Sequence, residues 1–119
     1  MLSDVHCEAN SKAEALSDFQ NALTFLNARN IVMTCICGDI TENGTAEELA
    51  MYKDIVSAYS PSTLVYTTTG NHDARQSGIN EERWLEYTGQ SVIFEKSVTL
   101  PDGRKDHYLF LGMSQIFQI

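Results

Sequence analysis

The sequence predicts an α/β fold in which strands and helices alternate before a final β-hairpin. Two short apolar segments rich in β-forming residues, 31–37 and 64–69, each stop at a glycine and have the length of buried strands. Segments with helical periodicity lie before and between them. Strands that alternate with helices pair in parallel through right-handed crossovers, so we expect a βαβαβ unit followed by the hairpin.

The first helix is predicted over residues 12–28, after a short first strand. Ser11 and Glu14 have the spacing of a capping box, which satisfies backbone N–H groups at a helix start. Apolar residues then recur at spacings of three and four: Leu16, Phe19, Leu23 and Leu26. The next apolar run, 31–37, is predicted to be a strand buried on both faces.

A second helix is predicted to begin at Thr45, which forms a second capping box with Glu48. Pro61 stops this helix. Its apolar face is formed by Leu49, Tyr52, Ile55, Val56 and Tyr59. After the strand 64–69, residues 80–88 are predicted to form a short third helix.

The last third of the chain predicts a β-hairpin. Residues 91–100 and 106–113 have strand character. The Pro-Asp-Gly-Arg sequence at 101–104 between them is a strong turn signal.

The composition excludes several classes of protein. The 119 residues suffice for one domain, and 43% hydrophobic residues can form a core, which excludes a disordered chain. A formal net charge of −8 argues against nucleic acid as the main partner. No apolar run is long enough to cross a membrane and no secretory signal opens the chain, so we expect a cytoplasmic protein without membrane contact.

Three cysteines in a chain without an export signal favour reduced thiols over disulfides. We expect Cys7 to be a small buried hydrophobe. Cys35 and Cys37 lie two residues apart in a predicted strand, without a second cysteine pair. We therefore expect both in or near the core, and not as zinc ligands.

Polar side chains with metal-binding chemistry follow each predicted strand. Asp4 and His6 follow the first strand, Asp39 the second, and Asn71 with His72 the third. Ligands of open α/β sheets bind beyond the carboxyl ends of the strands. Alternate residues of an extended segment point to the same side, so Asp4 and His6 can share a cation. Asp39 can bridge two cations and Asn71 adds a neutral oxygen, which suits a two-metal centre.

These residues occur in an ordered set of three motifs: Asp4-x-His6, Gly38-Asp39 and Gly70-Asn71-His72-Asp73. The set resembles the calcineurin-like metallophosphoesterase superfamily, with its layered α/β sandwich. The resemblance implies that Asp4 and His6 hold one metal, Asp39 bridges, Asn71 holds the second metal, and His72 assists the leaving group. The resemblance also places Glu42 at the rim of the site, in a part that varies within the superfamily.

The resemblance implies a phosphoric ester hydrolase that acts on phosphomonoesters or phosphodiesters. Two divalent cations, manganese, iron or zinc, would form a dinuclear centre and supply a metal-bound hydroxide. Members of the superfamily add histidines from later motifs that are not found here. We therefore expect residues 1–119 to be a single N-terminal part of the domain, without the C-terminal half of the ligands. A second copy in a homodimer is one source of the remaining donors.

Two other classes stay open as alternatives. A non-catalytic interaction module would keep the phosphoesterase fold without its chemistry. A receiver-like domain with an acidic metal pocket has a similar length but would end in further strand-helix units. Two residues also keep open roles: Asp73 either orients His72 or caps the next turn, and His107 is expected to be a surface histidine of the last strand.

Overall fold

A computed structural model describes residues 1–8, 13–75 and 79–112. Strands and helices alternate as predicted and end in an antiparallel hairpin. The elements are β1 (Leu2–Ser3), α1 (Ala13–Asn27), β2 (Met33–Cys37), α2 (Ala46–Tyr59), β3 (Leu64–Thr68), α3 (Glu81–Thr88), β4 (Ile93–Thr99) and β5 (Lys105–Leu111). The predicted cap of the first helix, Ser11, lies outside the described residues.

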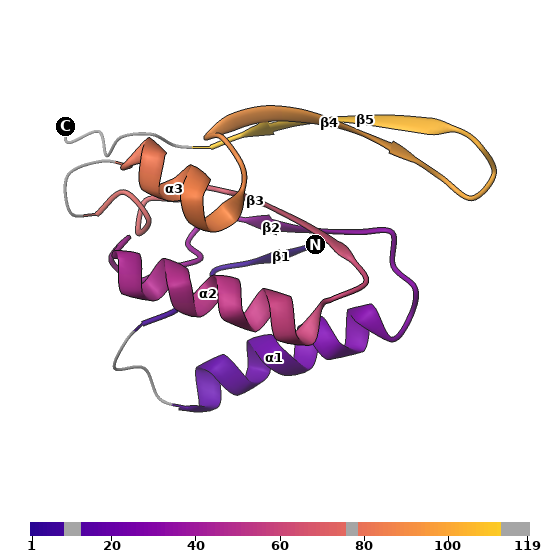
Figure 1. Ribbon diagram of the computed structural model, residues 1–119. Helices are drawn as coiled ribbons and strands as arrows, with labels where there is room; N and C mark the ends of the chain where they lie inside the picture. The colour runs from indigo at the N-terminus through magenta and orange to yellow at the C-terminus, as the bar shows by residue number, and fades with distance from the viewer. Residues whose placement is uncertain (9–12, 76–78, 113–119) are drawn as a thin grey trace.

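Three parallel strands form the central sheet in the order β1-β2-β3. Helices α1 and α2 lie together on one side of it (Figure 1). Ile36 of β2 is 1% exposed and Leu23 of α1 is fully buried between these layers. The buried core consists of Cys7, Phe19, Leu23, Ile36, Ile40, Leu49, Tyr52, Ile55, Trp84 and Val92.

The start of α2 confirms the predicted capping box. The Thr45 side chain accepts a hydrogen bond from the Glu48 backbone N–H at 3.2 Å, and Glu48 accepts from the Thr45 N–H at 3.3 Å. Asn80 caps α3 by accepting from the Arg83 N–H at 2.9 Å. These caps satisfy N–H groups that would otherwise lack partners.

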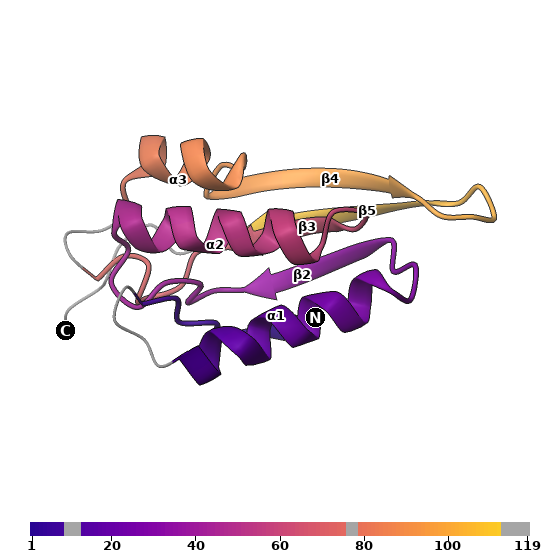
Figure 2. The same ribbon diagram turned by 60° about the horizontal axis from the view of Figure 1, so that its bottom comes forward.

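The hairpin β4-β5 packs against the sheet on the face away from α1 and α2. Tyr66 of β3 lies with its ring centroid 6.0 Å from Phe94 and 5.6 Å from Phe110. These two phenylalanines stack at 4.5 Å across the hairpin. The hairpin then extends beyond the sheet, and its turn lies far from the carboxyl ends of the parallel strands (Figures 1 and 2).

The prediction that β2 is buried on both faces is wrong for one face. Thr34 and Ile36, which face the helices, are 2% and 1% exposed. Cys35 is half-buried. Cys37 is exposed, so the prediction that it lies in or near the core is wrong. The hairpin contacts the sheet at Tyr66 of β3 and leaves the β2 face partly open.

The prediction for Cys7 is confirmed, because its side chain is fully buried. Within the described ranges, no helix combines the length and apolar character that a membrane span requires.

Candidate metal centre

The loops that leave β1, β2 and β3 are joined to one another by hydrogen bonds. The Asp4 N–H donates to the Gly38 carbonyl at 3.3 Å, and the His6 N–H donates to the Asp39 carbonyl at 2.9 Å. The backbone N–H of His72 donates to Asp39 Oδ1 at 2.9 Å. The three sets of predicted site residues therefore meet at one edge of the sheet, as the parallel topology requires.

Three of the predicted ligands have an unusual backbone conformation. Asp4, His6 and Asp39 have φ values of 54°, 49° and 51°, in the left-handed region that few non-glycine residues adopt. Strand β1 ends at Ser3, so the expectation of an extended segment for Asp4 and His6 is wrong. Left-handed turns bring the two side chains together instead, and such strain is concentrated at functional sites.

Asp4, His6 and Asp39 form one group of candidate metal ligands, with ligand atoms within 4.8 Å of one another. His6 Nε2 lies 3.8 Å from Asp4 Oδ1. Asn71 is exposed in the loop that carries His72. Carboxylate oxygens with an imidazole nitrogen suit manganese, iron or zinc, so the residues present fit a divalent cation.

A second group consists of His6, Glu42 and His72. Glu42 Oε2 lies 2.8 Å from His6 Nδ1, and Glu42 Oε1 lies 3.3 Å from His72 Nδ1. The two imidazole rings meet edge to face, with centroids 4.6 Å apart. Sequence reasoning placed Glu42 in a variable rim and missed this contact. The available signal was a carboxylate three residues after Asp39 in the same loop.

Arg75 completes this group, with Nη1 2.6 Å from Glu42 Oε1. Partial burial acts to raise the pKa of Glu42, but hydrogen bonds from His6 and Arg75 outweigh it, so the pKa lies below the ordinary value. An ionised Glu42 holds the Nδ1 side of both imidazole rings. Each ring can then present Nε2 to a ligand, which is how carboxylates orient metal-binding histidines.

The model of the calcineurin-like phosphoesterase family matches residues 1–116. The chain belongs to this family. A search of curated proteins finds no match. The match confirms the family that the three motifs predicted, and the parallel sheet with its helices and final hairpin agrees with the expected layered α/β fold.

Among the described residues, the contacts of Asp73, in the last position of the third motif, match neither of its two predicted roles. Its carboxylate accepts four hydrogen bonds from the neighbouring loops: from Gly70 N–H at 2.8 Å, Thr41 N–H at 2.9 Å, Thr41 Oγ1 at 2.7 Å and Ile40 N–H at 3.4 Å. Burial raises the pKa of this carboxyl in spite of these donors. Asp73 therefore ties the loop after β2 to the loop after β3.

Gly70 allows the loop after β2 and the loop after β3 to approach closely. A Cβ atom at this position would overlap the carboxylate and the backbone nitrogen of Asp39. The backbone nitrogen cannot move away without displacing the whole loop, so only glycine fits here.

His107 lies apart from the two ligand groups, as expected. It is exposed on β5, where its Nδ1 lies 2.8 Å from the Oγ of Ser97 on β4.

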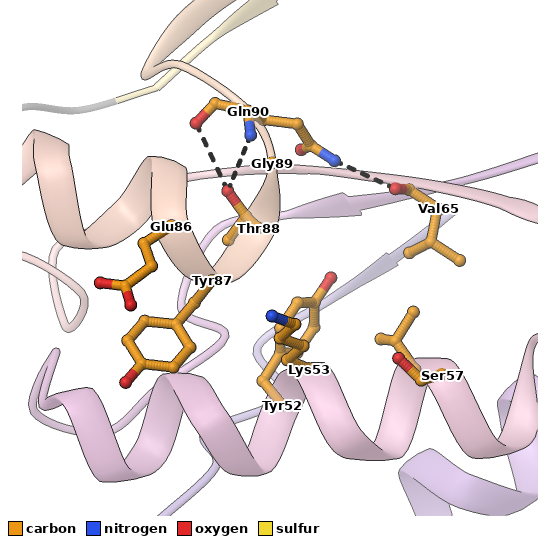
Figure 3. A pocket seen from close by; sticks show the side chains of 10 residues that line it. Tyr52, Lys53, Ser57, Val65, Glu86, Tyr87, Thr88, Gly89 and Gln90 are labelled. Carbon is orange, nitrogen blue, oxygen red and sulfur yellow. Dashed lines mark hydrogen bonds between the residues drawn. The ribbon is translucent and has the colours of Figure 1, made fainter.

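Two hollows in the surface differ in how close they lie to the candidate ligands. One, of about 300 Å³, adjoins Asp4 between β1 and α1. The other, of about 340 Å³, lies between α2 and the C-terminal end of α3 (Figure 3). Gln90 at its border bonds the edge of β3, donating to the Val65 carbonyl at 3.1 Å and accepting from the Thr67 N–H at 2.8 Å. The residues that line this second hollow include none of the candidate ligands.

Proposed function

We propose that the chain is a metal-dependent phosphoesterase that hydrolyses phosphomonoesters or phosphodiesters at the carboxyl ends of its parallel strands. The observation that carries the proposal is the group formed by Asp4, His6 and Asp39, whose ligand atoms lie within 4.8 Å of one another. Membership of the calcineurin-like phosphoesterase family supports a phosphate ester as the substrate.

We infer that two divalent cations bind there. Asp4 and His6 would hold one, Asn71 would hold the other, and Asp39 would be shared by both. The 3.8 Å separation of His6 Nε2 from Asp4 Oδ1 supports a shared cation at the first position. Manganese, iron and zinc all accept this donor set. When bound, such cations acidify a water molecule and neutralise phosphoryl oxygens.

His72 would donate a proton to the leaving oxygen of the ester. Its Nδ1 lies 3.1 Å from the Glu42 carbonyl and 3.3 Å from Glu42 Oε1, and its side chain is 21% exposed. A ring held in this way at Nδ1 leaves Nε2 for the substrate, and a positioned general acid contributes about 10²- to 10⁴-fold to the rate.

The experiment compares Asp39→Asn with His72→Ala, and uses His107→Ala as the control at an exposed histidine outside the groups. Metal content after loading with Mn²⁺ or Zn²⁺ and gel filtration is measured by elemental analysis, together with hydrolysis of p-nitrophenyl phosphate and its bis ester. We expect Asp39→Asn to lose metal. We expect His72→Ala to keep metal and to lower kcat by about 10²- to 10⁴-fold.

Equal metal loss in both variants would refute the separate roles of Asp39 and His72. A wild-type chain that binds metal but hydrolyses neither ester would favour the alternative, a non-catalytic module that keeps the fold. A wild-type chain that retains metal only when a second polypeptide is added would mean that donors from outside these residues complete the centre.

A further inference from the structure

Arg75 is the cationic side chain beside the candidate metal centre. Within the described residues, it is the only lysine or arginine that forms an ion pair with a member of either ligand group. Its backbone N–H donates to the His72 carbonyl at 3.1 Å, which closes a single turn. This turn places the side chains of His72 and Arg75 on one loop, three residues apart and next to Glu42.

The exposure of Arg75 shows that it lies at the rim of the site. Its side chain is 48% exposed, whereas those of Glu42 and His72 are 27% and 21% exposed. The guanidinium of Arg75 is therefore more accessible to a solute than the side chains of Glu42 and His72.

The hydrogen bonds of Arg75 leave most of its donors for a ligand. A guanidinium carries five N–H donors in a planar fork. In the described contacts only Nη1 is engaged, at 2.6 Å from Glu42 Oε1 and 3.5 Å from the Glu42 carbonyl. Glu42 can therefore keep Nη1 in place while Nε and Nη2 bind an oxyanion. Arginine suits this task because its fork matches the spacing of phosphate oxygens.

The charge of the site makes such a residue useful. The chain has a formal net charge of −8, and the two ligand groups contain three carboxylates, Asp4, Asp39 and Glu42. An anionic ester approaches this surface against repulsion that a bound cation or an arginine must reverse.

We propose that Arg75 binds the non-bridging oxygens of the phosphoryl group and thereby contributes to substrate and product affinity. This inference rests on the proposed function, because it assigns Arg75 to the same site. The competing explanation is that Arg75 only neutralises Glu42 and so acts through the two histidines. In that case its removal would resemble the removal of Glu42.

The test measures binding of inorganic phosphate to metal-loaded protein by calorimetry, with metal content determined on the same samples. The variants are Arg75→Ala, Arg75→Lys and Glu42→Gln. Arg104→Ala serves as the control, because it removes the same charge from an exposed arginine of the hairpin turn whose side chain is 74% exposed.

We expect Arg75→Ala to weaken phosphate binding by roughly 10- to 100-fold, the effect of losing hydrogen bonds to a charged group. Metal content should stay at the wild-type level, Arg75→Lys should recover part of the affinity, and Arg104→Ala should bind as the wild type does. In hydrolysis, KM should rise more than kcat falls.

Three results would overturn the inference. In the first, Arg75→Ala binds phosphate as tightly as the wild type does. In the second, Arg75→Ala loses as much metal as Glu42→Gln does. In the third, the metal-loaded wild type does not bind phosphate. Phosphate binding that depends on Arg75 in a wild-type chain without esterase activity would instead refute the proposed function and leave this oxyanion site standing.

Discussion

The buried carboxylate of Asp73 offers a sharp test of how the site is held together. In Asp73→Asn the shape of the side chain is kept, but one carboxylate oxygen becomes an NH₂ group. If the amide keeps its oxygen toward Thr41, its nitrogen faces the Gly70 N–H, which donates at 2.8 Å in the wild type. If the amide turns round, it faces the Thr41 N–H, which donates at 2.9 Å. Either orientation leaves a short backbone hydrogen bond without its acceptor.

The expected loss of stability follows from these bonds. A buried N–H group left without a partner costs about 1–3 kcal/mol, and the weaker bond from Ile40 at 3.4 Å is lost in the first orientation as well. Release of a buried charge offsets part of this, because burial raises the pKa of Asp73 and so disfavours its ionised form. We therefore expect Asp73→Asn to lower the free energy of unfolding by about 2 kcal/mol.

Urea unfolding at pH 7, followed by circular dichroism, measures this change. The matched control is Asp102→Asn in the hairpin turn, where a carboxylate that is 53% exposed also accepts hydrogen bonds from its own loop. That substitution should change the stability by less than about 0.5 kcal/mol. A loss below about 0.5 kcal/mol in Asp73→Asn, equal to the control, would refute the role of Asp73 as the tie between the two loops.

Two further predictions concern the same loops and the cysteines. Gly70→Ala should lower the metal content of Mn²⁺-loaded protein, because its Cβ would displace Asp39, and a metal content at the wild-type level would contradict the packing described. Iodoacetamide at pH 8 should modify the exposed Cys37 in folded protein but not Cys7, which is buried and whose pKa is raised to about 12 by that burial. Since the thiolate is the reactive form, peptide mass spectrometry that finds Cys7 modified before unfolding would contradict its place in the core.

Local signals in the sequence predicted the elements of the fold well. The Thr45 and Glu48 pair marked the start of α2, and the turn signal at 101–104 marked the hairpin, because both depend on residues close together in the chain. The burial of Cys37 was predicted wrongly for the opposite reason. A strand of apolar residues does not reveal which layers cover its two faces, and here the hairpin packs against β3.

The candidate ligands were also predictable, since the motifs lie at strand ends that parallel pairing brings together. The contacts of Glu42 with His6, His72 and Arg75 were not. They depend on the path of the loop after β2, and that path depends on the Asp39 backbone at a φ of 51°. Aspartate adopts the left-handed conformation more often than most residues, but this preference is too weak to predict it at a given position, where the surroundings impose it.

That strain connects the stability of the chain with its chemistry. Each left-handed residue among Asp4, His6 and Asp39 costs of order 1 kcal/mol or more, and the cost falls on the residues that carry the candidate ligand atoms. The hydrogen bonds that hold these residues in place come from neighbouring loops, such as the bond from His6 N–H to the Asp39 carbonyl at 2.9 Å. Loosening the loops would let the backbone relax to φ values at which the side chains no longer converge. A substitution at Asp73, which contacts none of these three side chains in the described bonds, is therefore expected to weaken metal binding through geometry alone.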